Sequence, residues 1–105
     1  MFDFLKKIMG GGPDVDFRQM VKEGALILDV RTPGEYAGGH IKGAINIPVD
    51  QLRSNLNKLK NKDQVIITCC ASGMRSASAR GLLQQAGYSQ VHNGGGWNGL
   101  LDKIS

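Results

Sequence analysis

Short strand-like runs alternate with amphipathic segments along this chain of 105 residues. The segments predicted to form strands are residues 25–30, 44–48, 65–69 and 90–93. Between them, apolar residues recur every three or four positions, which is typical of helices packed on a sheet. The alternation predicts an α/β fold with a largely parallel sheet.

Capping residues and glycines mark the expected helix ends. Asp14 or Asp16 can cap the first helix of the domain, and Gly24 follows its end. A short helix is expected after Pro33, and Asp50 can cap a longer one. The apolar faces of the predicted helices are Phe17, Met20 and Val21; Leu52, Leu56 and Leu59; Ala79, Leu82, Leu83 and Ala86; and Trp97, Leu100, Leu101 and Ile104.

The first twelve residues differ from the rest. Phe2, Leu5, Ile8 and Met9 suit one face of a short helix, which residues 10–13 would end with three glycines and a proline. We therefore expect an N-terminal arm at residues 1–12 and a single domain at residues 13–105. The arm either packs on the domain or anchors it weakly to a membrane surface or a partner.

Composition and charge narrow the function classes. Apolar residues make up 41% of the chain and charged residues 21%, as in ordinary globular domains. The net charge of +4 comes from scattered lysines, which favours small anionic ligands over nucleic acid. No apolar stretch is long enough to predict a membrane span. The two cysteines are adjacent, so no disulfide framework is predicted, which favours a cytoplasmic location; a mature exported form is left open. We also expect a monomer.

The strongest chemical signal is the segment 65–76. An apolar strand leads to Cys70, then to a turn of small residues and to Arg75 at the start of a helix. Helix N-termini and nearby arginines lower the pKa of a thiol and hold anions, so Cys70 is the candidate nucleophile. From this pattern alone, Cys70 as a buried inert residue stays open, and Cys69 is expected to be inert.

Other polar residues also follow strand ends. Asp29 and Arg31 come after the first strand, and residues 94–96 come after the last. Ligands of parallel sheets bind beyond the carboxyl ends of the strands, so these residues should converge with Cys70.

Residues 28–36, 39–48, 70–76 and 86–97 together resemble single-domain rhodaneses, which are sulfurtransferases. The resemblance implies a three-layer fold around a five-stranded, mostly parallel sheet. It also implies that Cys70 accepts a sulfane sulfur from a small anion or persulfide and passes it, as a persulfide, to cyanide, a thiol or a protein cysteine. No metal or other cofactor is implied.

The same resemblance assigns roles residue by residue. Cys70 is catalytic; Asp29, Arg31 and Ser76 support the pocket; His40 is structural and His92 matches nothing catalytic. The substrate-binding loop is Ala71, Ser72, Gly73, Met74 and Arg75. Because Arg75 is its only formal cation, strong binding of thiosulfate is not expected, and a protein-bound or small-thiol persulfide is a plausible donor beside thiosulfate.

Two alternatives remain at this point. Cys69 stands at the longer spacing from Arg75 that cysteine phosphatases and arsenate reductases use, although Gly73 and Thr68 favour sulfur transfer. The second alternative is a binding module that uses the fold without catalysis. Cys69 as a resolving thiol under oxidation is a further hypothesis.

Overall fold

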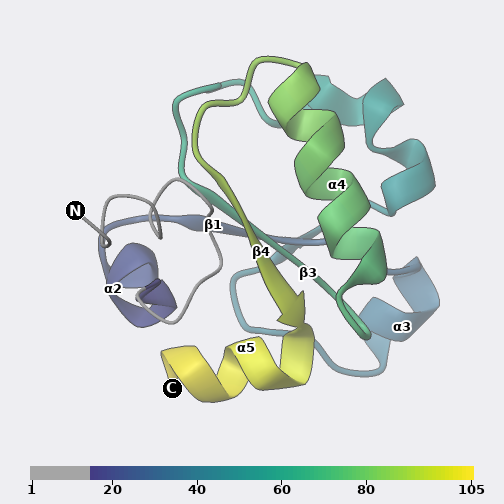
Figure 1. Ribbon diagram of the computed structural model, residues 1–105. Coiled ribbons are helices and arrows are strands. Elements are labelled where there is room, and N and C mark those ends of the chain that lie inside the picture. Colours follow the sequence, from purple (N-terminus) through teal and green to yellow (C-terminus); the bar gives the residue numbers. More distant parts are fainter. Residues whose placement is uncertain (1–14) are drawn as a thin grey trace.

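The computed structural model describes residues 15–105, and its four strands form one parallel sheet (Figure 1). The strands are β1 (Leu26–Asp29), β2 (Ile45–Asn46), β3 (Ile66–Cys70) and β4 (Val91–Gly96), in the order β2-β1-β3-β4. Each predicted strand segment is therefore confirmed. The predicted arm at residues 1–12 lies outside the described residues, so it and the domain boundary stay predictions.

Helices cover both faces of the sheet and complete three layers (Figure 1). On one face, α4 (Met74–Gln85) and the 3₁₀ helices η1 (Val49–Gln51) and η2 (Arg53–Lys58) enclose an apolar cluster that includes Leu28 and Ile66. On the other face, α2 (Phe17–Lys22) and α5 (Trp97–Ile104) enclose a second cluster around Ile27 and Ile67. Alternate side chains of β1 and β3 thus enter different clusters, as a doubly covered parallel sheet requires.

The predicted cap at Asp16 is confirmed, and a further cap is found at Thr32. Asp16 caps α2 by accepting a hydrogen bond from the Gln19 N–H. Thr32 and Glu35 form a reciprocal capping box at the start of α3 (Pro33–Ala37). Within residues 15–105, none of the helices has the length and apolar character needed to cross a membrane.

The fifth strand implied by the resemblance is not found among the described residues. β2 has only two residues, and Pro48, which has no N–H to donate, follows shortly after it. The remaining described segments are helices, turns and connections. The sheet of residues 15–105 is therefore four-stranded.

The helix predicted from Asp50 is wrong in type, although its buried leucines are correct. Leu52 and Leu59 are buried, but the segment forms η1 and η2, and Asp50 does not cap it. The Asn55 side chain donates to the Gln51 carbonyl, the acceptor that the Asn55 N–H would use in an α-helix. The Asn55 N–H bonds instead to Leu52, three residues back, which produces the 3₁₀ geometry.

Two boundary predictions near the chain end also need correction. Residues 94–96 were expected to follow the last strand, but they continue β4, and Gly96 pairs with Cys70. Leu101 was expected to be buried in α5 and is 36% exposed, whereas Leu100 is fully buried.

Candidate functional site

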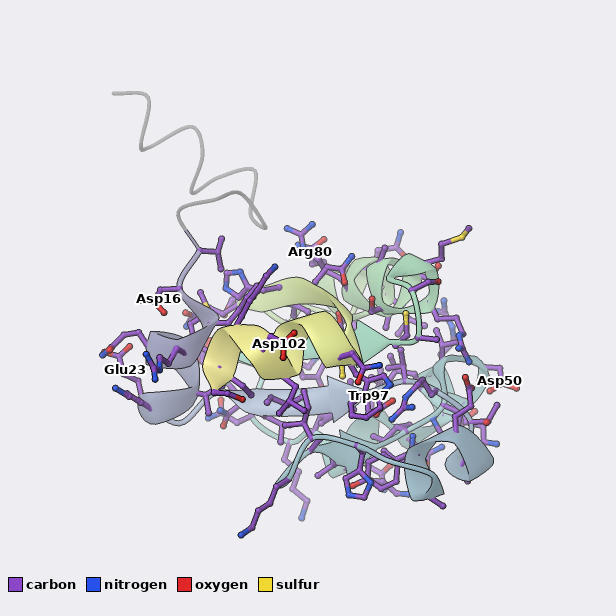
Figure 2. All side chains as sticks on the ribbon, turned by 90° about the horizontal axis from the view of Figure 1, so that it is seen from below. Asp16, Glu23, Asp50, Arg80, Trp97 and Asp102 are labelled. Atoms are coloured by element: carbon purple, nitrogen blue, oxygen red, sulfur yellow. The ribbon has the colours of Figure 1, made fainter. Side chains whose placement is uncertain are left out.

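Three strand ends meet where the sequence predicts a pocket. Asp29 at the end of β1 pairs with Cys69, and Cys70 at the end of β3 pairs with Gly96 at the end of β4. Trp97 follows at once, at the end of the sheet toward which the strand arrows point (Figure 2). The loop from Cys70 to α4 starts at this edge, so the predicted convergence is present.

The Cys70 sulfur lies under a ring of hydrogen-bond donors. It accepts from the Gly73 N–H at 2.9 Å and the Ser76 N–H at 3.3 Å, and lies 3.4 Å from the Ser76 hydroxyl oxygen. Burial raises the pKa of the Cys70 thiol, but hydrogen bonds from the Ser76 hydroxyl and the N–H groups of Ser76, Gly73 and Ser72 lower it. The net result is a pKa below that of an ordinary cysteine, as a nucleophilic thiol needs.

Glycines allow the loop to take this shape. Gly73, the N-cap of α4, has a φ of +105°, a left-handed conformation that residues with a Cβ rarely adopt. Gly96 lies directly beneath the loop, and a Cβ there would stand 2.9 Å from the Ala71 carbonyl oxygen. Gly96 therefore lets the loop lie against the end of β4, a role that the sequence analysis did not assign.

A second set of polar groups holds the Ser76 side chain. Its hydroxyl oxygen lies 2.6 Å from Asn93 Oδ1 and 3.0 Å from the Gly73 carbonyl oxygen. Asn93 Oδ1 also accepts the Gly95 N–H at 2.9 Å. Since a hydroxyl has one proton, Ser76 can donate to only one acceptor at a time, and Asn93 competes with the Cys70 sulfur for it.

Arg75 is bound by a residue that the sequence analysis did not connect to the site. Its Nη1 and Nη2 lie 2.7 Å and 3.0 Å from the two carboxylate oxygens of Glu35, on α3. The forked face that was expected to hold an oxyanion is thus engaged with Glu35 in this structure. The Thr32–Glu35 capping box is visible in the sequence, but nothing there identifies Arg75 as the partner of Glu35.

Asp29 and Arg31 form a buried ion pair at the pocket wall. Arg31 Nη2 lies 2.6 Å from Asp29 Oδ2, and both side chains are almost fully buried. Arg31 also donates to the carbonyls of Glu35 and Gly39 and stacks 4.8 Å above the Trp97 ring. The pair therefore links β1, α3 and α5, which fits the bracing role expected of it.

The two neighbouring cysteines lie on opposite faces of the sheet. Cys69 belongs to the cluster under α2 and α5, whereas Cys70 belongs to the cluster under α4. Burial, followed by the charge of Asp29, raises the pKa of Cys69 to about 12. Cys69 therefore suits the inert role expected of it and is placed away from the loop.

The remaining predicted positions lie at the rim or outside the site. Ala71, Ser72 and Met74 are exposed, and Met74 is 80% exposed. His40 stacks on Tyr36 with its ring centroid 3.7 Å away. Burial, followed by the charge of Arg80, lowers the pKa of His92. Neither histidine is hydrogen-bonded to Cys70.

Two other features of the described residues bear on the site. No group of three or more His, Cys, Asp or Glu side chains within residues 15–105 is arranged to hold a metal ion. A cavity of about 110 Å³ lies at the opposite edge of the sheet, where Leu26 and Ile66 begin β1 and β3. Its lining, which includes Lys58, Lys60 and Gln64, shares no residue with the Cys70 loop.

Comparisons with known proteins agree with this geometry. Residues 14–103 match the family model described as a rhodanese-like domain. The chain is 34% identical to the thiosulfate sulfurtransferase PspE of Escherichia coli K12, over 66% of this chain and 67% of the relative. It is 33% identical to the human thiosulfate:glutathione sulfurtransferase, over 92% of this chain and all of the relative. Among solved structures, the human single-domain sulfurtransferase TSTD1 superposes with a TM-score of 0.75 at 31% identity, covering 90% of this chain and all of that chain.

Proposed function

Because this chain belongs to the rhodanese-like domain family and is a rhodanese-type sulfurtransferase, we propose that it carries sulfane sulfur as a persulfide on Cys70. The observation that carries this proposal is the Cys70 sulfur itself, buried at the end of β3 and hydrogen-bonded by the N–H groups of Gly73 and Ser76. These donors favour an anionic sulfur at the position where a nucleophile is needed.

In the first half-reaction, the Cys70 thiolate attacks the outer sulfur of the donor. A sulfur–sulfur bond to Cys70 forms while the bond inside the donor breaks. The electron pair of the broken donor bond leaves with sulfite when the donor is thiosulfate, or with a thiolate when the donor is a persulfide. The products are the Cys70 persulfide anion and the released donor fragment, so charge and atoms balance.

The loop from Ala71 to Arg75 is proposed to hold this persulfide anion. The first N–H groups of a helix have no partner within the helix, and those of Met74 and Arg75 begin α4 beside the sulfur. Preorganised donors of this kind stabilise charge without reorganisation at the moment of reaction.

In the second half-reaction, an acceptor nucleophile attacks the outer sulfur of the persulfide and restores the Cys70 thiolate. The acceptor class proposed here is cyanide, a small thiol or a protein cysteine. Asp29 and Arg31 are proposed to brace the pocket wall, and Ser76 to donate to the sulfur when it is ionised.

Sulfur loading tests the proposal directly. The protein is incubated with thiosulfate or an organic persulfide and analysed by mass spectrometry. We expect a gain equal to one sulfur atom on Cys70, its loss on adding cyanide, and no gain in the Cys70→Ser variant. The Cys69→Ser variant is the matched control and should load normally. A folded wild-type protein that gains no sulfur from any of these donors would contradict the proposal.

A cysteine phosphatase is the competing enzyme class, and it would use Cys69 at the longer spacing. The position of Cys69 on the face opposite the loop disfavours this chemistry. Its signature would be turnover of an aryl phosphate that survives Cys70→Ser and is lost in Cys69→Ser. A binding role without catalysis would instead leave the biological activity of Cys70→Ser unchanged.

A further inference from the structure

The only formal cation of the Cys70 loop is held by a carboxylate from another element. Both terminal nitrogens of Arg75 bond to Glu35, at 2.7 Å and 3.0 Å. The two side chains are about equally exposed, 36% and 37%, so the pair lies at the mouth of the site. The bidentate pair occupies the forked edge formed by the two terminal nitrogens, one of the edges with which a guanidinium can bind an oxyanion, and it also neutralises the charge of Arg75.

Glu35 is also fixed from its own side. Its Oε1 accepts hydrogen bonds from the Thr32 N–H and the Thr32 hydroxyl, both at 3.1 Å. Hydrogen bonds from Arg75 and then from the Thr32 backbone lower the pKa of Glu35 to about 2. The carboxylate is therefore ionised in neutral buffer, and its bonds to Thr32 orient it toward Arg75.

We propose that Glu35 sets the donor class of this enzyme by neutralising Arg75 and competing with the donor anion for it. The site then favours sulfane-sulfur donors with one negative charge, such as an organic hydropersulfide, over the dianion thiosulfate. This inference rests on the proposed function. Glu35 acts through Arg75 and is a positioning residue that does not itself touch the reacting sulfur.

The effect has a quantitative signature because Coulomb energy is proportional to the charge of the donor. Removing the charge of Glu35 should improve the binding of a monoanion by some factor and that of a dianion by the square of that factor. An exposed charge pair supports a factor of about two to three for each donor charge. A purely structural defect would change the two donors equally.

Two donors of matched chemistry provide the test. Thiosulfate is a dianion that releases sulfite, and methanethiosulfonate is a monoanion that releases methanesulfinate after the same attack by Cys70. In Glu35→Gln, the amide oxygen can still accept from Thr32, so the cap of α3 is retained while the charge is removed. We expect kcat/KM to rise about four- to nine-fold for thiosulfate and about two- to three-fold for methanethiosulfonate, mainly through KM. Both gains should shrink at high salt.

Glu23→Gln is the matched control. It raises the net charge of the protein by the same amount. Glu23, however, is the C-cap residue of α2 and lies at the edge of the molecule away from the strand arrow tips (Figure 2). We expect it to leave the ratio of the two donors unchanged. The double variant Glu35→Gln with Arg75→Gln carries no formal charge at either position, as the wild-type pair carries no net charge. The ratio of kcat/KM for thiosulfate to that for methanethiosulfonate should therefore return toward the wild-type ratio.

The outcomes separate this inference from the proposed function. If neither donor loads wild-type Cys70 with sulfur, the proposed function fails. If both donors load but Glu35→Gln leaves their ratio unchanged, or Glu23→Gln changes it as much, the role of Glu35 is overturned. If Glu35→Gln does not fold, the double variant decides: a donor ratio shifted away from that of the wild type contradicts the inference.

Discussion

The Ser76 hydroxyl should control how readily Cys70 ionises. Among residues 15–105, Ser76→Ala removes the one side-chain hydroxyl in hydrogen-bond contact with the sulfur and keeps the Ser76 backbone N–H, which lies 3.3 Å from it. No acceptor is stranded by the change, because Asn93 Oδ1 retains the Gly95 N–H at 2.9 Å. The variant therefore isolates one hydrogen bond to an ionising sulfur.

The size of the effect follows from that bond. A hydrogen bond to a charged group contributes about 1.5–3 kcal/mol, or roughly a ten- to hundred-fold change in the ratio of thiolate to thiol. The lower end of this range applies here, because the Gly73 and Ser76 N–H groups remain. The single Ser76 hydroxyl proton is also sought by Asn93 Oδ1 and by the Gly73 carbonyl oxygen. We expect the pKa of Cys70 to rise and the thiolate fraction in neutral buffer to fall about ten-fold.

The assay is the rate of Cys70 alkylation by iodoacetamide as a function of pH, followed by mass spectrometry. The rate of Ser76→Ala should be about one tenth of the wild-type rate at acidic pH, and the two rates should converge once both thiols are ionised. Ser78→Ala is the matched control, an exposed serine on the same helix α4. Equal rates for Ser76→Ala and wild type at low pH, in a protein with an unchanged urea midpoint, would refute the reasoning.

Three further predictions concern neighbouring positions. Asn93→Ala removes the nearer of two acceptors that compete with Cys70 for the Ser76 proton, the other being the Gly73 carbonyl, so alkylation of Cys70 at low pH should become faster; a slower rate would contradict the competition. In the native wild type, alkylation should modify Cys70 at a lower pH than it modifies free cysteine. It should spare Cys69, whose pKa burial raises to about 12, until urea unfolds the chain. Gly96→Ala places a Cβ 2.9 Å from a loop carbonyl and should lower the free energy of unfolding by about 1–3 kcal/mol, whereas Gly81→Ala, in an open position of α4, should raise it by up to about 1 kcal/mol.

The sequence predicted the features that local spacing determines. The Cys70-to-Arg75 loop, the cap at Asp16 and the four strand segments depend on residues that are neighbours in the chain, so their patterns are visible without a structure. The helix expected from Asp50 failed because one side chain, Asn55, took the carbonyl that its own backbone would have used. Residues 94–96 are all glycine and show no alternation of apolar and polar side chains. The extension of β4 through them was therefore not visible in the sequence.

The contacts that tune the site were not predictable in the same way. Glu35 and Arg75 are 40 residues apart, and Asn93 is 17 residues from Ser76. Each of these pairs depends on how the ends of separate elements meet at one edge of the sheet. Glu35 takes part in the capping box of α3, a local contact, whereas its second partner, Arg75, appears only when α3 and α4 are placed together.

The choice between the two cysteines follows from strand geometry rather than from the residues themselves. Successive side chains of β3 point to opposite faces, so Cys69 and Cys70 share a backbone but not an environment. Burial raises the pKa of both thiols, and only Cys70 has the N–H groups of Gly73 and Ser76 within reach to reverse that effect. A shift of one residue in the end of β3 would exchange the two thiols. The end of β3 at Cys70 and the left-handed N-cap of α4 at Gly73 therefore place the Cys70 sulfur, and not that of Cys69, under the N–H groups of the loop.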